Sequence, residues 1–207
     1  MSNFHLKPFV AVLLIAFLTA CASGQKTSDP VATTAVPKTG DAAIGLSVTA
    51  ARPYVVNGDK PDSVVGVYRR EGGSQFDSYT RGKVPFANDV EKAILNSSAA
   101  WGLPLKRLNV PATDSNAVSL AAGNDGLSRV VTIEVLEWKS ISYQNGGSVK
   151  YDLVLRVFDA QGVELAAANN KGADRLKSWS LASESMNFQR AISDMFGQAQ
   201  IADALDI

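Results

Sequence analysis

The chain has very little of what most enzymes and metal proteins use for chemistry. Its 207 residues include one histidine, His5, and one cysteine, Cys21, both near the amino terminus. The rest of the chain therefore offers no imidazole or thiol for a Ser-His-Asp or Cys-His relay. Zinc, copper and haem sites draw on the same side chains, and one cysteine cannot form a disulfide within the chain. We expect no metal, no cofactor and no enzymatic activity.

Charge and hydropathy also lack extremes. Twenty Lys and Arg balance twenty Asp and Glu, for a formal net charge of +0. Nucleic-acid-binding proteins show a basic excess or stripe, so no nucleic-acid partner is expected. The one pronounced apolar run, residues 8–20, covers roughly 20 Å as a helix, short of the roughly 30 Å hydrocarbon core. This length is typical of a secretory signal rather than of a membrane span.

The apolar run ends in a short motif that points to a membrane anchor. Leu18, Thr19, Ala20 and Cys21 follow one another as a leucine, a small polar residue, a small residue and the only cysteine. The motif resembles bacterial lipoprotein signals, in which residues such as 1–20 are removed and the cysteine receives two or three acyl chains, palmitate among them. That number of chains gives stable attachment. The alternative is an ordinary secretory signal that ends near a cysteine. By the same resemblance, Ala22 in place of Asp favours the outer membrane, facing the periplasm, over the inner membrane.

Composition divides the remaining chain into a tether and one domain. Residues 21–41 are mainly Ser, Thr, Pro, Ala and Gly, too small and polar to form a core. A flexible chain of this length has an r.m.s. reach of about 25 Å. Residues 42–207 suffice for a single compact domain.

Hydrophobic periodicity predicts an α+β fold for this domain. Strands are expected at 44–50 and 63–69, and a three-stranded antiparallel meander is expected over 127–143, 149–158 and from 163, fading at 169–172. Amphipathic helices are expected from Pro85 to Trp101, closed by Gly102, and over 182–204, with a possible bend at Gly197. Residues 57–59, 71–79 and 111–126 are expected to be turns or loops. The economical arrangement is an antiparallel sheet with both helices packed on one face.

Few residues in the domain suggest a site. Glu134 and Glu137 are three apart on a strand, so they are expected to face opposite sides and not to act as a catalytic pair. Three aromatic residues near one hairpin could form a binding platform for a sugar or a peptide, or could pack across the strands. They are Trp138, Tyr143 and Tyr151. The basic pair at 69–70 could touch lipid head groups, but two charges contribute only about 1 kcal/mol each.

One phrase of the sequence carries a family resemblance. It contains Trp138, Tyr143, the Tyr151-Asp152-Leu153 segment and the turn at 159–162, after a lipoprotein signal and before an amphipathic helix. Together these resemble the YajG-like group of small, poorly characterised bacterial lipoproteins. The resemblance implies an outer-membrane lipoprotein and brings no catalytic residues.

These observations favour a non-enzymatic envelope lipoprotein that acts as an interaction or accessory module, with an envelope protein as the expected partner and an unknown oligomeric state. The alternative is an auxiliary subunit for lipid or small-molecule transport. Its apolar ligand would lie on the helix-free face of the sheet or between helices and sheet.

Overall fold

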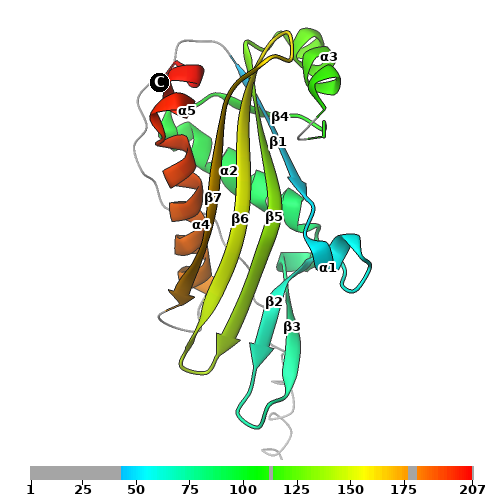
Figure 1. The fold of residues 1–207 in the computed structure, drawn as a ribbon, viewed down its shortest axis with the longest axis vertical. Helices are drawn as coiled ribbons and strands as arrows, with labels where there is room; N and C mark the ends of the chain where they lie inside the picture. Colours follow the sequence, from blue (N-terminus) through cyan, green and yellow to red (C-terminus); the bar gives the residue numbers. More distant parts are fainter. Residues whose placement is uncertain (1–42, 112–113, 177–180, 207) are drawn as a thin grey trace, which may run out of the picture.

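The fold is described from a computed structural model that places residues 43–111, 114–176 and 181–206, without the side chains of 99–101 and 181–186. The predicted signal, the tether and Cys21 lie outside these residues. Among the described residues, no helix combines the length and the apolar character needed to cross a membrane. The described chain forms an α+β fold built on one seven-stranded sheet (Figure 1).

A long central strand organises this sheet. The strands are β1 (Ile44–Ala50), β2 (Val64–Arg69), β3 (Gln75–Tyr79), β4 (Leu105–Arg107), β5 (Arg129–Tyr143), β6 (Gly146–Asp159) and β7 (Glu164–Leu176). One edge of β5 pairs with β6, which pairs with β7, and both pairs are antiparallel, so the predicted meander is confirmed. The third strand continues through the predicted fade.

The other edge of β5 corrects the prediction of a purely antiparallel sheet. The first part of β5 pairs with β1 and the last part with β2, both in parallel. Strand β4 adds to β1 in parallel, and β3 adds to β2 in antiparallel orientation. Between β1 and β2 the chain leaves the sheet to form α1 (Pro53–Val56), a short helix just before the turn expected at 57–59. The sheet is therefore mixed, because β1 and β2 run in the same direction as β5, whereas β6 runs in the opposite direction.

Three helices cover one face of the sheet and enclose the main core. They are α2 (Phe86–Trp101), α4 (Leu181–Phe196) and α5 (Ala199–Leu205). The helix α2 matches its prediction, and Gly102 closes it with a φ of 73°. The predicted bend at Gly197 is a complete break between α4 and α5. Alternate residues of β6, Val149 through Val157, point into this core as predicted.

The opposite face carries one helix, which the sequence prediction missed. Helix α3 (Ser115–Asp125) occupies a segment expected to be a loop, and Asp114 caps it by accepting a hydrogen bond from the Ala117 amide at 3.0 Å. Val118 and Ala122 pack against a second, smaller core on β5 and β6. Helices therefore lie on both faces, and the described fold has five α-helices and the 3₁₀ turn η1 (Arg81–Lys83) instead of two helices.

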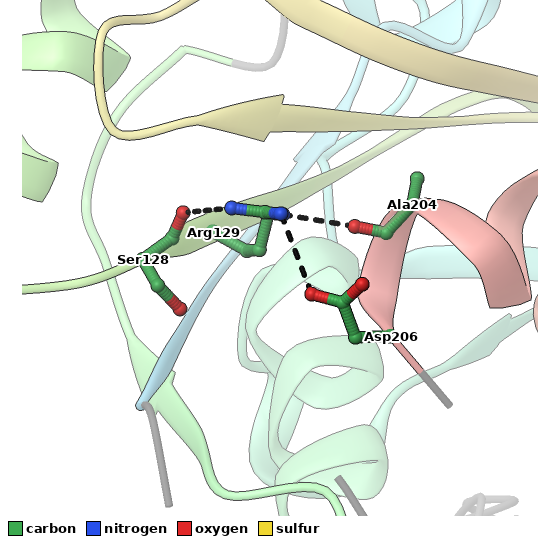
Figure 2. A network of polar contacts seen from close by, with 4 residues as sticks. All are labelled: Ser128, Arg129, Ala204 and Asp206. Atoms are coloured by element: carbon green, nitrogen blue, oxygen red, sulfur yellow. Dashed lines mark hydrogen bonds and ion pairs between the residues drawn. The ribbon is translucent and has the colours of Figure 1, made fainter. Parts of the chain in front are cut away.

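The two ends of the sheet differ in what they carry (Figure 1). The proximal end holds the start of β1 and the carboxyl-terminal helix, whereas the distal end holds the β2–β3 and β5–β6 turns. At the proximal end, Arg129 donates to the carbonyls of Ser128 and Ala204 at 2.9 Å each and lies 3.4 Å from Asp206 (Figure 2). This contact fastens α5 to β5. The first described residue, Ala43, therefore lies at the end opposite the two turns.

Candidate interaction surface

The three aromatic residues of the predicted platform do not share one exposed surface. Trp138 and Tyr151 are buried on the helix-covered face, with ring centroids 6.0 Å apart. Trp138 also meets Phe188 of α4 edge to face at 5.3 Å. Tyr143 is 45% exposed at the distal end of β5 and lies on the other face by register. Trp138 and Tyr151 therefore serve core packing, and of the three aromatic residues only Tyr143 is accessible to a partner.

The two glutamates of β5 lie on the same face, contrary to the prediction. The register with β6 shifts between Val135 and Glu137, so Leu136 is an extra residue. A β-bulge of this kind reverses the alternation that follows it. Glu134 now lies opposite Val154, and Glu137 lies opposite Asp152, two residues away on the same side of β6.

This arrangement does not form a catalytic pair or a metal site. Glu134 lies 3.4 Å from Arg156, which also approaches Glu164 at 3.6 Å. Asp152 pairs with Lys171 at 2.6 Å. No acidic cluster among the described residues could hold a metal ion. In the middle of this face Glu134 and Asp152 are therefore paired, whereas Glu137 has no described ion pair and its buried Oε1 makes no hydrogen bond.

Toward the distal end the same face becomes basic. Register places the side chains of four strands there: Arg69 on β2, Lys139 on β5, Lys150 on β6 and Arg175 on β7. We call this set the distal basic face. Within the described residues none of the four has an ion-pair partner, and the buried Nε of Arg69 makes no hydrogen bond. The acidic residue at this level, Asp77, is paired with Lys60 at 2.8 Å. A chain with no net charge thus concentrates four unpaired cations on one sheet surface.

The positions of Lys139 and Lys150 lower the stability of the sheet. The two residues are directly opposite each other on antiparallel strands, and both are exposed. Like charges in this position destabilise a sheet, whereas opposite charges stabilise it. Tyr143 and the half-buried Ile141 lie on the same face of β5. A destabilising pair beside an exposed aromatic residue is typical of a surface that meets something outside the chain.

A buried arginine fixes the strand that carries Arg69. Arg52, which is 0% exposed, lies where the chain leaves β1 for α1. Its guanidinium donates to the carbonyls of Val64 and Asp62 and to the Tyr54 hydroxyl at 2.9 Å. Tyr54 in turn donates to the Trp138 carbonyl at 2.7 Å. This chain of contacts joins the start of β2 to β5, and burial raises the pKa of Tyr54 above its usual value.

Arg52 also packs against the edge of the main core. Its guanidinium lies 4.6 Å from the centre of the Phe86 ring at the start of α2. The same residue therefore holds the β2–β3 hairpin and the first turn of the main covering helix. Sequence reasoning passed over it, because an arginine before a proline carries no signal of burial.

A second charged residue lies inside the fold. Glu91 of α2 is 5% exposed and contacts Arg107 at 2.5 Å. Burial raises the pKa of Glu91, and the arginine only partly opposes this shift. This pair joins α2 to the edge strand β4 and lies outside the distal basic face.

No protein-family model matches the chain, and a search of curated proteins finds no match. Several solved structures superpose on it. Protein XCC0632 from Xanthomonas campestris, of the DUF330 family, is 14% identical, with 87% of this chain and 91% of that chain covered and a TM-score of 0.49. A PelC dodecamer from Paraburkholderia phytofirmans is 18% identical, covering 77% and 91%, with a TM-score of 0.46. Lipoprotein GNA1162 from Neisseria meningitidis is 17% identical, covering 74% and 99%, with a TM-score of 0.31.

The structural neighbours thus include bacterial lipoproteins, but likeness at this level carries no argument about function. Membership of the YajG-like group stays a prediction from the sequence phrase. The functional conclusion has to rest on the chain's own surface.

Proposed function

We propose that the protein is a lipid-anchored, non-enzymatic accessory protein of the bacterial envelope. It acts through surface contacts of its folded domain, and the distal basic face is the docking surface for a negatively charged envelope component. The observation that supports this proposal is the exposed Lys139–Lys150 pair, which destabilises the sheet and in which neither lysine has an ion-pair partner among the described residues.

The sequence supports the anchored and non-enzymatic parts of the proposal. The motif that ends in Cys21 supplies a lipid attachment point, and no histidine follows it. The tether enters the domain at the proximal end, so the docking surface lies at the far end of β5. Fifteen residues of strand at about 3.3 Å each separate the two ends by roughly 50 Å.

The alternative of an apolar ligand finds no support in the contacts. The space between the helices and the sheet is occupied by the main core, which includes Trp138, Leu153 and Phe188. The opposite face carries ion pairs and unpaired cations. The apolar residues at its proximal end, among them Val130 and Phe158, are packed under α3. Neither place therefore leaves free the apolar lining that such a ligand needs.

In-cell photocrosslinking tests the proposal with the full chain, signal included. A photoreactive residue replaces Ser148, an exposed position of β6 on the distal basic face. The matched control replaces Lys92, an exposed position of α2 on the helix-covered side of the sheet. We expect an adduct with a protein or a lipid from position 148 and none from position 92. Equal labelling from both positions, or none from 148, would contradict the docking surface. Replacement of Cys21 by Ser should release the protein from the membrane fraction.

A further inference from the structure

The distal basic face extends across four neighbouring strands, which limits what can bind to it. Its cations come from β7, β6, β5 and β2, which are consecutive strands about 4.8 Å apart, so the face is roughly 15 Å wide. A small ligand would touch only one or two of these side chains. A surface that offers many negative charges in a plane can meet all four.

We infer that the occupant of this face is an anionic membrane surface, contacted through the phosphate groups of its lipids. This inference rests on the proposed function and names the chemistry of the docking partner. Lys and Arg side chains have long apolar stems that extend their charged ends toward head groups, and tyrosine is suited to the boundary between apolar and wet regions. Tyr143 stands on this face among the cations.

A second exposed residue lies on the same side of the molecule. On α3, Val118 and Ala122 are 0% exposed and point at the sheet. Leu120 lies between them in sequence, about 200° around the helix, and is 70% exposed. It therefore points away from the sheet on the side where the distal basic face lies. An apolar contact near the tether and a basic contact at the far end suit a domain that rests on a membrane along its length.

The expected strength fits a tethered contact. Each basic side chain near an anionic membrane strengthens binding about fivefold, so four give an association constant on the order of 10³ M⁻¹. Free protein would bind such a surface only at millimolar lipid. The tether predicted at residues 21–41 would supply a local concentration in the millimolar range, so the anchored domain would alternate between bound and free. The lipid anchor and the basic face thus act together.

Vesicle binding tests the inference with a matched pair of variants. The protein is the chain from residue 21 onward with Cys21→Ser, which keeps every described contact because these lie within residues 43–206. The vesicles are phosphatidylcholine alone, or phosphatidylcholine mixed with phosphatidylglycerol. Lys139→Glu is compared with Lys92→Glu, which changes the net charge equally at an exposed position of α2.

Lys139→Glu separates a binding role from a structural one. It turns the like pair with Lys150 into an opposite pair, so the thermal midpoint should stay equal or rise. Binding to the phosphatidylglycerol vesicles should nevertheless fall about 30-fold, because one attraction is lost and one repulsion is added. Lys92→Glu should bind like the parent, and the phosphatidylcholine vesicles should bind none of the proteins.

Two results would overturn the inference. One is equal loss of vesicle binding in the Lys139 and Lys92 variants. The other is no preference of the parent for phosphatidylglycerol. If position 148 then crosslinks to an acidic protein, the docking surface stands and its occupant is a protein instead of lipid. If position 148 yields no adduct either, the proposed function falls as well.

Discussion

Removal of the Arg52 side chain should detach the β2–β3 hairpin while leaving the meander folded. Arg52 is fully buried and is the donor that joins the start of β2 to the rest of the sheet. In Arg52→Ala, the Val64 carbonyl loses the Arg52 donor, whereas the Asp62 carbonyl keeps the hydrogen bond from the Phe86 amide at 3.2 Å. Each buried acceptor left unpaired costs about 1–3 kcal/mol.

The total can be bounded from these contacts. One unpaired carbonyl gives roughly 1–3 kcal/mol, and loss of the cation–π contact with Phe86 adds about 1 kcal/mol or more. The variant no longer buries a charge that lacks a described acidic partner, and this gain offsets part of the loss, since desolvation of an ion costs several kcal/mol. We expect a net loss of about 2 kcal/mol in the free energy of unfolding. Arg52→Lys should recover only part of it, because an ammonium lacks the planar fork of donors.

Two measurements check this expectation. Urea unfolding gives the loss of stability, and hydrogen exchange shows where the chain opens. Residues 64–79 should exchange much faster in Arg52→Ala, while β5 and β6 keep their protection. The exposed Arg70, stacked on Phe76 at the hairpin tip, provides a control, and Arg70→Ala should change stability by less than about 0.5 kcal/mol. A loss below about 1 kcal/mol with unchanged exchange in the hairpin would refute the reasoning.

Three further predictions concern other contacts. Gly66→Ala should destabilise the hairpin by about 1–3 kcal/mol in urea unfolding, because its Cβ would overlap the β5 backbone; an unchanged midpoint would rule this out. Glu91 holds its proton more readily in the folded chain, so its contribution to stability is greatest below its usual pKa of 4.5 and is lost as the pH rises through the raised value. Unfolding at pH 4 and pH 7 should therefore show the parent losing stability relative to Glu91→Gln, and a constant difference would exclude the effect. Arg129→Ala should free α5, seen as faster exchange at 199–205, and protection equal to the parent would argue against the contact in Figure 2.

Sequence periodicity predicted the elements whose signals are strong and local. Helix α2 combines an apolar stripe with a proline before it and Gly102 after it, and the strands of the meander alternate cleanly. Helix α3 was missed because its buried side consists of only Val118 and Ala122 among Ser, Asn, Ala and Gly. Such small residues are enough to pack a helix against a sheet, but they give almost no hydrophobic periodicity in the sequence.

Pairing between distant segments could not be read in this way. Nothing local shows that β1 and β2 share one edge of β5, so the parallel pairs were unexpected. The bulge at Leu136 reversed the side of Glu137 through a single extra residue.

The distal basic face was invisible for the same reason. Its residues come from four strands and are up to about a hundred positions apart, so the basic pair at 69–70 was the only part of it that the sequence indicated. The aromatic hairpin was predicted as a site or as packing, and the structure uses Trp138 and Tyr151 for packing. Lipidation at Cys21 and the outer-membrane location stay predictions.

The most direct test of the docking surface is the yield of the crosslink from position 148 in cells, measured in three backgrounds. The account predicts a strong adduct in the parent and with Lys92→Glu, and a sharp loss with Lys139→Glu at unchanged protein level. An adduct that persists in full with Lys139→Glu would contradict the claim that these cations hold the partner.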